Sequence, residues 1–516
     1  MNGLSIGKCL AAGMVGIGPM MLSSIQAVEA QHPNIIYIMS DDHALQAIGA
    51  YDGWAAKVSP TPNIDRIAKE GAIFKNNFCA NSICGPSRAC VITGKQSHMN
   101  GMLDNHSKFD GSQVTAPKLL QKSGYSTAIF GKWHLVSNPT GFDEWMVLPG
   151  QGDYYNPDYL TPEGKKRLEG YVPEVTTDLV IDYLKRQKSD EKPFFLMCHY
   201  KAPHRNWMPG PKYLNYLDGV EIPEPSNLFD DYANRAKPAS QQDMSIERTM
   251  NIASDLKLAD YSKGPPAWFE RMNPEQKKLW TEKYVPVRIE FEKKNLSGKE
   301  LTKYKFQRYM EDYLRCVKAV DDNVGRILEY LDKSGLAANT IVIYSSDQGF
   351  YLGEHGWFDK RWMYEESFRM PLLMRWPGKI KPGTEISALT QNIDFAPTFL
   401  DASGAPPCNE MQGMSLLPLL DGKTPDNWRK SLYYHYYEFP KPHNVPPHYG
   451  VRTDKYKLIH YYKTDEWEMF DMEKDPHEMR SIYSDPSYSE IRKELESELV
   501  RLQKYYQVPE DLRWKK

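Results

Sequence analysis

The stretch PNIIYIMSDD, residues 33–42, decides the fold, because a largely apolar run leads directly into two adjacent carboxylates. A run of this kind is typical of a strand that is buried on both faces of a parallel sheet. Similar runs follow at residues 126–130, 193–197, 340–344 and 371–374. Helical patterns separate them, for example at residues 62–70 and 309–333. This alternation predicts an α/β fold with a doubly wound, mostly parallel sheet.

Chemically capable side chains follow four of these predicted strands. In chain order they are Asp41 and Asp42, then Lys132 and His134, then His204, and finally Asp347 and Gln348. In an open parallel sheet, ligands bind beyond the carboxyl ends of the strands. The sequence therefore predicts a functional site at this edge of the sheet.

The acidic residues at two of these strand ends predict a metal site. Asp41, Asp42 and Asp347 would repel one another if they lay together without a cation. With the amide oxygen of Gln348 they form an all-oxygen ligand set, which suits Ca²⁺ or Mg²⁺ rather than Zn²⁺. Each pair also has an ordinary interpretation, Asp41 and Asp42 as a helix cap and residues 347–349 as a turn. Their coincidence at two strand ends favours the metal.

Length and composition limit the class of protein. A chain of 516 residues can bury one large domain and a smaller one. Its 41% hydrophobic and 25% charged residues are ordinary for a globular protein. The net charge of -3 gives no reason to expect a nucleic-acid partner. The seven cysteines lack a CxxC or zinc-type spacing and are expected to be mostly buried free thiols.

The N-terminal residues predict export. Lys8 precedes a small, apolar stretch that ends in small residues at Ala30, which is the layout of a secretory signal peptide over residues 1–30. A disordered leader is the alternative interpretation. No later stretch is long and apolar enough for stable membrane insertion. We therefore expect a periplasmic or secreted protein.

The pattern and composition of the remaining sequence predict two domains. Residues 31–420 carry the strand and helix alternation, with a long insertion at about 206–308 that is rich in proline, asparagine and charge. Residues 421–516 predict a smaller α+β subdomain. Its aromatic, alternating stretches indicate an antiparallel sheet at residues 432–437, 449–453, 456–462 and 467–471, closed by a helix at residues 488–506.

Residues 84–95, CGPSRACVITGK, place a cysteine at a special position. Pro86 suits the first turn of a helix and Gly94 suits its end. Cys84 then lies at a helix N-terminus, where backbone N–H groups favour an anion. Taken alone, this position indicates a thiol of low pKa. The pattern C-x-P-S-R followed by T-G-K, however, resembles the signature of the type I sulfatases, which depend on formylglycine.

The resemblance covers nearly all of the chain after residue 30. It includes TPNIDRIAKEG (61–71), GKWH (131–134), APH (202–204), SDQGFYLGEHGWFDKRWMYEE (346–366), NIDFAPTFLDASG (392–404) and GVRTDKYKLI (450–459). It implies an alkaline-phosphatase-like fold with a C-terminal subdomain. It also implies that an external maturase converts Cys84 to formylglycine. The implied cofactor is Ca²⁺, with Mg²⁺ as the less favoured ion, held by Asp41, Asp42, Asp347, Gln348 and an oxygen of modified residue 84.

The resemblance implies roles for the remaining polar residues. The hydrated aldehyde of residue 84, oriented by Ca²⁺ and Arg88, would attack the sulfur of a sulfate ester. His204 would protonate the departing sugar oxygen, and His134 would take a proton from the second hydroxyl. Lys132 and Lys360 would hold the sulfate oxygens. The charges agree, because three carboxylates balance Arg88, Lys132 and Lys360, and a divalent cation then leaves the pocket suited to an anion.

The substrate is suggested by residues 358–361, FDKR, followed by Tyr364 and Glu365. This segment looks most like that of N-acetylglucosamine-6-sulfatases and related bacterial glycan sulfatases. By that similarity Asp359 and Arg361 would bind sugar hydroxyls, with His448 reaching in from the C-terminal subdomain. The equally open alternative is a local ion pair between Asp359 and Arg361, with His448 as a loop residue. The expected activity is exo-acting removal of 6-O-sulfate from N-acetylglucosamine in heparan, keratan or mucin glycans.

Three alternatives remain open at this stage. The chain could be a sulfatase for another sugar, such as sulfated N-acetylgalactosamine or galactose. It could be a phosphoester hydrolase of the same superfamily, which release of phosphate instead of sulfate would reveal. It could also be a glycan-binding protein with an inactive site, which an unmodified Cys84 thiol in the native host would favour.

Overall fold

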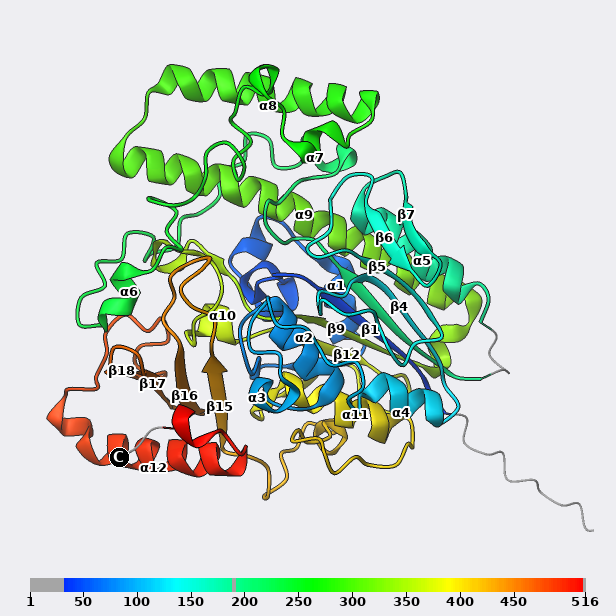
Figure 1. Ribbon diagram of the computed structural model, residues 1–516, viewed down its shortest axis with the longest axis vertical. Coiled ribbons are helices and arrows are strands. Elements are labelled where there is room, and N and C mark those ends of the chain that lie inside the picture. Colours follow the sequence, from blue (N-terminus) through cyan, green and yellow to red (C-terminus); the bar gives the residue numbers. More distant parts are fainter. Residues whose placement is uncertain (1–31, 188–191, 514–516) are drawn as a thin grey trace, which may run out of the picture. The chain divides into compact units, whose positions relative to one another are not determined.

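A ten-stranded mixed sheet forms the centre of the computed structural model, which describes residues 32–187 and 192–513 (Figure 1). The predicted signal peptide lies outside these residues. The strand order is β13-β2-β12-β9-β1-β8-β4-β5-β6-β7. The parallel centre consists of β9 (Thr340–Ser346), β1 (Asn34–Ser40), β8 (Phe194–Tyr200), β4 (Ser126–Lys132) and β5 (Glu144–Leu148). The edges consist of β13 (Thr384–Ile386), β2 (Ala72–Phe74), β12 (Leu372–Arg375), β6 (Asp158–Thr161) and β7 (Gly164–Arg167).

The direction of β12 differs from the prediction. Residues 371–374 were expected to form a parallel strand, but β12 pairs antiparallel with both β9 and β2. The segment after β9 contains the short strands β10 (Tyr351–Leu352) and β11 (Phe358–Asp359) and helix α10 (Glu365–Phe368). None of the helices among these residues is a crossover that returns the chain to the opposite edge of the sheet. The chain therefore re-enters the sheet from the edge at which β9 ended, and it must run the opposite way.

Helices cover both faces of the sheet, as a doubly wound fold requires. Because successive side chains of a strand point to opposite faces, Ile36 and Ile38 of β1 belong to one core, whereas Ile35 and Tyr37 belong to the other. The first core includes α1 (Pro62–Lys69), α5 (Val172–Leu184) and α9 (Gly298–Ser334). The second includes α2 (Cys84–Thr93), α4 (Ala116–Lys122) and α11 (Phe395–Ala402). The predicted α/β fold class is confirmed.

The long helix α9 joins the predicted insertion to the core. It begins at Gly298, so it crosses residue 308, where the insertion was expected to end. Within the insertion, α6 (Lys237–Gln241), α7 (Ala267–Glu270) and α8 (Pro274–Lys294) precede it. Helix α8 packs back on α9, since the rings of Phe291 and Tyr304 stack with centroids 5.1 Å apart. Farther along, the Asp321 carboxylate accepts hydrogen bonds from the backbone N–H groups of Asn63 and Ile64 and so caps α1.

The C-terminal part matches its prediction closely. Strands β15 (Ser431–Tyr436), β16 (His448–Thr453), β17 (Tyr456–Tyr461) and β18 (Glu466–Asp471) form a four-stranded antiparallel sheet. Helix α12 (Ser489–Tyr505) covers one face of it, where Leu495 and Leu499 join a cluster with Tyr433 and Val451 (Figure 1). Further short elements are α3 (Ser97–Asn100), β3 (Asn77–Phe78) and β14 (Thr390–Gln391), and short 3-10 helices occur in the connections. No helix in residues 32–187 and 192–513 has the length and apolar character of a membrane span.

A buried charge cluster joins α9 to α8 and to the rest of the insertion. The fully buried Asp312 carboxylate contacts Lys257 Nζ at 3.0 Å, Arg315 Nη1 at 2.8 Å and Arg308 Nη2 at 3.1 Å, and it accepts a hydrogen bond from Tyr284 at 2.8 Å. Burial alone would raise the pKa of Asp312, but the surrounding cations hold it well below its usual range. This carboxylate therefore stabilises the folded state as an ion.

We predict that Asp312→Asn lowers the free energy of unfolding at neutral pH by about 3–5 kcal/mol, because it leaves buried cations without their partner. Urea unfolding measures this loss. The pKa of Asp312 is depressed in the folded state, so its contribution is present above about pH 4 and is lost progressively as the pH falls from there through the folded pKa. The difference in free energy of unfolding between variant and wild type should shrink over that range. Asp178→Asn breaks the exposed pair with Arg326 and is the control, with an expected effect below about 1 kcal/mol. Equal losses in the two variants would contradict this account.

Candidate active site

The predicted acidic residues meet at the carboxyl edge of the sheet. Asp41 and Asp42 follow β1, and Asp347 follows the neighbouring strand β9. All three are fully buried, and an oxygen of each lies within 4.8 Å of the other two. The backbone N–H of Asp42 donates to Asp347 Oδ1 at 3.1 Å, which holds the two strand ends together. The structure therefore brings together the carboxylates that the sequence predicted to share a site.

Three buried cations surround these carboxylates. Lys132 Nζ pairs with Asp41 Oδ2, and Lys360 Nζ lies 2.6 Å from Asp42 Oδ1. Arg88 Nη2 lies 3.0 Å from Asp347 Oδ2 and 3.5 Å from Asp41 Oδ1. These cations come from β4, from the loop after β11 and from α2. Elements far apart in the sequence thus supply three positive charges to match three negative ones.

The pKa values show that this balance is incomplete. Burial, together with the neighbouring carboxylates, raises the pKa of Asp42 to about 8 in spite of Lys360. Burial and Asp41 likewise raise the pKa of Asp347 to about 6. For Asp41, burial acts in the same direction, but Lys132, His204 and Arg88 outweigh it and lower its pKa. A further cation would allow all three groups to ionise.

Gln348 supplies the test of whether a metal ion would fit. Its side chain is buried, its Nε2 donates to Asp42 Oδ1 at 2.5 Å, and its Oε1 has no hydrogen-bond partner in the described chain. The two ends of an amide are assigned by their hydrogen bonds and exchange by a flip. An unpartnered amide oxygen beside three carboxylates is the donor set that a hard divalent cation prefers. The residues present therefore fit such an ion.

Cys84 is the first residue of α2 and is fully buried beside the carboxylates. Its Sγ lies 3.5 Å from Asp41 Oδ1. Burial and the charge of Asp41 raise the pKa of the Cys84 thiol far above its ordinary value. The interpretation of Cys84 as a low-pKa thiol is therefore wrong, because desolvation and the neighbouring acid outweigh the helix N-terminus. An unmodified thiol here is neutral and a weak nucleophile.

The two predicted histidines lie around this cysteine. A nitrogen of His204 is within 4.8 Å of Cys84 Sγ and of an Asp41 oxygen. Its Nδ1 lies 2.7 Å from the Arg205 carbonyl, so Nδ1 carries the proton, and Nε2 faces Asp42 Oδ2 at 3.8 Å. His134 has a left-handed backbone with φ of 57°, and its buried Nδ1 has no partner in the described chain. Burial and Lys132 lower the pKa of both histidines.

Asp359 and Arg361 flank the catalytic candidate Lys360. Arg361 Nε lies 3.5 Å from Asp359 Oδ1, so the local ion pair that we considered does form. Both side chains also have other partners: Arg361 Nη1 lies 2.5 Å from Glu438 Oε1, and Asp359 Oδ2 lies 3.0 Å from His443 Nε2. Asp359 and Arg361 have left-handed φ values of 79° and 96°, a strained conformation that persists where function or surrounding contacts require it.

The expected role of His448 stays a prediction, and its buried Nε2 has no hydrogen-bond partner in the described chain. His448 is fully buried as the first residue of β16, and its ring packs against Trp362, Tyr434 and Tyr461. His443, five residues earlier, is the histidine that contacts Asp359. The alternative of His448 as a loop residue is wrong, because the pairing of β16 with β15 turns its side chain into an aromatic layer.

Other residues at the site were missed by the sequence analysis. Glu438, His443 and Asn105 lie in loops without a recognisable pattern. Lys201 follows β8 and is only 4% exposed, and no hydrogen bond or ion pair in the described chain engages its ammonium group, which lies 4.8 Å from the Tyr154 ring centroid. Burial and Lys132 lower the pKa of Lys201 to about 8. Its place directly before Ala202-Pro203-His204 was the available signal.

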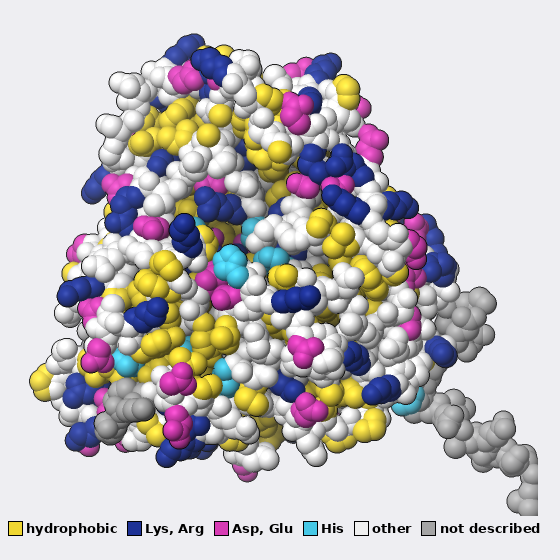
Figure 2. Space-filling model, viewed as in Figure 1, with side chains coloured by type: hydrophobic (Ala, Val, Ile, Leu, Met, Phe, Trp, Pro, Cys, Tyr) yellow, Lys and Arg dark blue, Asp and Glu magenta, His cyan; other side chains and the backbone are white. Residues whose placement is uncertain are grey.

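The surface agrees with a site on this face. Figure 2 shows histidine side chains gathered at a hollow, with acidic and basic side chains around it.

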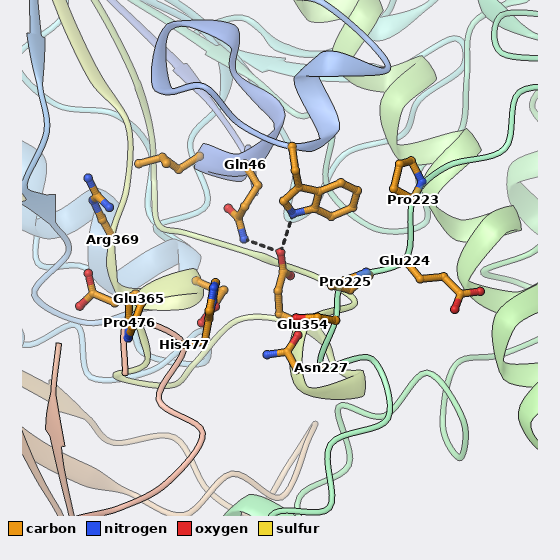
Figure 3. A pocket seen from close by; sticks show the side chains of 14 residues that line it. Gln46, Pro223, Glu224, Pro225, Asn227, Glu354, Glu365, Arg369, Pro476 and His477 are labelled. Atoms are coloured by element: carbon orange, nitrogen blue, oxygen red, sulfur yellow. Dashed lines mark hydrogen bonds between the residues drawn. The ribbon is translucent and has the colours of Figure 1, made fainter. Parts of the chain in front are cut away.

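A separate cavity of about 460 Å³ is lined by Gln46, Trp54 and Glu354 among others, and it includes none of the catalytic candidates. Gln46 and Trp54 donate to Glu354 Oε1 at 3.1 and 3.0 Å (Figure 3). These three polar side chains of the cavity are thus already paired with one another.

Comparison with known proteins identifies the chemistry of this arrangement. The sulfatase family matches residues 33–405, and the family described as "N-sulphoglucosamine sulphohydrolase, C-terminal" matches residues 353–505. An N-acetylglucosamine-6-O-sulfatase of Bacteroides thetaiotaomicron is 50% identical over 93% of this chain and 88% of its own length. The human N-acetylglucosamine-6-sulfatase is 27% identical over 84% of this chain and 70% of its own.

One solved structure is similar over nearly its whole length. It shows a protein in complex with its substrate D-glucosamine-2-N,6-O-disulfate, and it matches with a TM-score of 0.91 and 49% identity over 93% of this chain and 99% of that one. A phosphonate monoester hydrolase of Agrobacterium radiobacter, at 18% identity and a TM-score of 0.68, shares the fold.

We predict that a divalent cation stabilises the protein through the acidic cluster. Adding Ca²⁺ to protein freed of metal by a chelator should raise the melting temperature, because a ligand that binds only the folded state stabilises it. Asp42→Asn should lose most of this shift, whereas Asp158→Asn, which lies in an edge strand outside the cluster, should keep it. The same Ca²⁺-induced shift in wild type and Asp42→Asn would contradict the assignment. The readout is thermal stability, so it needs no catalytic activity.

Proposed function

The chain belongs to the sulfatase family, and we propose that it removes the 6-O-sulfate from N-acetylglucosamine units of sulfated glycans. The arrangement of Asp359, Lys360 and Arg361 carries this proposal, since it places potential sugar ligands on both sides of a lysine that reaches the carboxylate cluster. The 50% identity to an N-acetylglucosamine-6-O-sulfatase over nearly the whole chain supports the choice of sugar. We favour exo action on heparan, keratan or mucin glycans.

We propose Ca²⁺ as the resident cation, held by Asp41, Asp42, Asp347, Gln348 and residue 84, and formylglycine made from Cys84 by an external maturase. The cation would supply the positive charge that three buried carboxylates call for, and the modified residue would supply a nucleophilic oxygen where the thiol is neutral. The unpartnered Gln348 Oε1 and the raised pKa of Cys84 support these two assignments.

Lys132 and Lys360 are proposed to bind the sulfate oxygens. Each ammonium group reaches one carboxylate of the cluster, and both are almost completely buried. In such a dry environment they stabilise negative charge on the sulfate more strongly than they would in water. Arg88 holds Asp347 and orients the start of α2, where residue 84 lies.

His204 is proposed to donate a proton to the departing sugar oxygen. The Arg205 carbonyl fixes the proton on Nδ1, which leaves Nε2 as the atom that faces the site and takes up and delivers the catalytic proton. His134 adjoins Lys132 on the same strand end, and its unpartnered Nδ1 makes it the candidate acceptor of a proton from residue 84.

Asp359, Arg361 and His448 are proposed to bind the hydroxyl groups of the sugar, together with His443, which contacts Asp359. The carboxylate accepts hydrogen bonds, and the guanidinium and imidazole groups donate them. The partner is accordingly a sulfated glycan. The signal peptide predicted at residues 1–30 supports a periplasmic or secreted location.

We predict that matured protein releases sulfate from N-acetylglucosamine-6-sulfate and that Cys84→Ala abolishes the release. Ion chromatography of free sulfate measures both. Parallel assays on sulfated galactose and N-acetylgalactosamine test the sugar. Release only from another sugar would contradict the roles of Asp359, Arg361 and His443. If protein shown by mass to carry the aldehyde released no sulfate from any of these sugars, exo-acting sulfatase activity itself would be contradicted.

We predict that His204→Asn slows hydrolysis of a sugar sulfate far more than that of an aryl sulfate. A sugar alkoxide needs a proton to depart, whereas a phenolate leaves without one, and a general acid contributes roughly 10²–10⁴-fold. The ratio of kcat values for the two substrates in wild type and variant measures the difference. The same proportional loss on both substrates would remove His204 from the role of general acid.

A further inference from the structure

A chain of hydrogen bonds connects the sugar side of the site to the helix that begins at residue 84. Arg361 Nη1 donates to Glu438 Oε1 at 2.5 Å. The other carboxylate oxygen, Glu438 Oε2, accepts from the backbone N–H of Asn105 at 3.1 Å. The side chain of Asn105 then accepts from the backbone N–H of Gly85 at 2.9 Å. Three segments from different parts of the chain are thus joined through one carboxylate.

The Asn105 end of this chain caps helix α2. The first backbone N–H groups of a helix have no partner within it, and a side-chain oxygen that accepts from one of them fixes the start of the helix. A Cβ on residue 85 would lie 3.1 Å from Asn105 Oδ1 and 3.2 Å from the His134 carbonyl oxygen, so both oxygens are close to this residue. The cap therefore sits directly against the peptide that follows residue 84.

The Arg361 end supports a strained segment. Residues 359 and 361 both have left-handed φ values, and a conformation of this kind persists only where surrounding contacts hold it. Glu438 provides such a contact, because it is 5% exposed and its pair with the 4% exposed Arg361 is shielded from solvent. Tyr434 adds another by donating from its hydroxyl to the Arg361 carbonyl at 2.8 Å.

We propose that Glu438 and Asn105 are positioning residues that tie the sugar-binding Arg361 to the helix start carrying residue 84. Contact of the sugar with Arg361 thereby helps to fix the nucleophilic residue in place. The inference rests on the proposed function for the role of Arg361. The part of the inference that concerns Asn105 and residue 84 does not depend on the sugar and applies to any sulfate ester. Small misplacements of a reacting group lower the rate by as much as about 10²-fold, so a link of this kind has a measurable effect.

The test is a double-mutant cycle on matured protein. kcat and KM are measured for wild type, Arg361→Ala, Asn105→Ala and the double variant, with N-acetylglucosamine-6-sulfate and with an aryl sulfate that has no sugar hydroxyls. The cycle is repeated in a Glu438→Gln background, which keeps the size of the side chain but loses its charge. Asn105→Asp is the rescue variant, because its carboxylate still accepts from Gly85. Asp394→Asn breaks a comparable buried pair with Arg429 and is the matched control.

We expect Asn105→Ala to lower kcat on both substrates by about tenfold or more with little change in KM, and Asn105→Asp to restore it. On the sugar sulfate, the losses from Arg361→Ala and Asn105→Ala should be non-additive by at least about threefold, and additive within about twofold once Glu438 is glutamine. Asp394→Asn should keep kcat and KM, and thermal melting checks that every variant is folded.

Independent losses in the wild-type background, or an unchanged kcat for folded Asn105→Ala on the aryl sulfate, would overturn the inference. Failure of the proposed function would give a different result, in which wild type hydrolyses the aryl sulfate but not N-acetylglucosamine-6-sulfate. The effect of Asn105→Ala on kcat for the aryl sulfate would still decide whether Asn105 positions residue 84.

Discussion

The structure of the site follows from the repulsion among three carboxylates buried at two neighbouring strand ends. Asp41, Asp42 and Asp347 are brought together by the parallel pairing of β1 with β9, and they are fully buried. The fold counters this repulsion by drawing Arg88, Lys132 and Lys360 from three separate elements. The raised pKa values of Asp42 and Asp347 show that these cations do not suffice. A divalent cation would supply the missing positive charge, and the pocket with that cation in place would suit an anionic substrate.

The arrangement of strands could be predicted because strands buried on both faces read as continuous apolar runs. Each of the five predicted strands exists within a few residues of its expected bounds. Strand direction is a different property, which depends on the path of the connection and not on the run itself. For this reason β12 was assigned the wrong direction. The start of α9 was placed too late because its early buried positions include the polar residues Thr302, Lys305 and Arg308, so the apolar periodicity of the later turns is missing there.

The positions of the candidate catalytic residues were predictable for a similar reason, since most of them follow strands or belong to the CGPSR motif. The sugar side of the site was less accessible to prediction. Glu438 and His443 come from a loop after β15, and only the tertiary fold shows that this loop meets Asp359 and Arg361. The aromatic surroundings of His448 could not be predicted either, because the pairing of β16 decides which face its side chain takes and turns it into the aromatic layer.

The central claim is that residue 84, in modified form, carries the chemistry of this acidic pocket. The most direct measurement follows the rate of sulfate ester hydrolysis against the fraction of protein that carries an aldehyde at residue 84, determined by peptide mass in preparations with different exposure to a maturase. The account predicts a rate proportional to that fraction and no activity when it is zero, because burial keeps the Cys84 thiol neutral. Full activity in protein that carries only the thiol would contradict it.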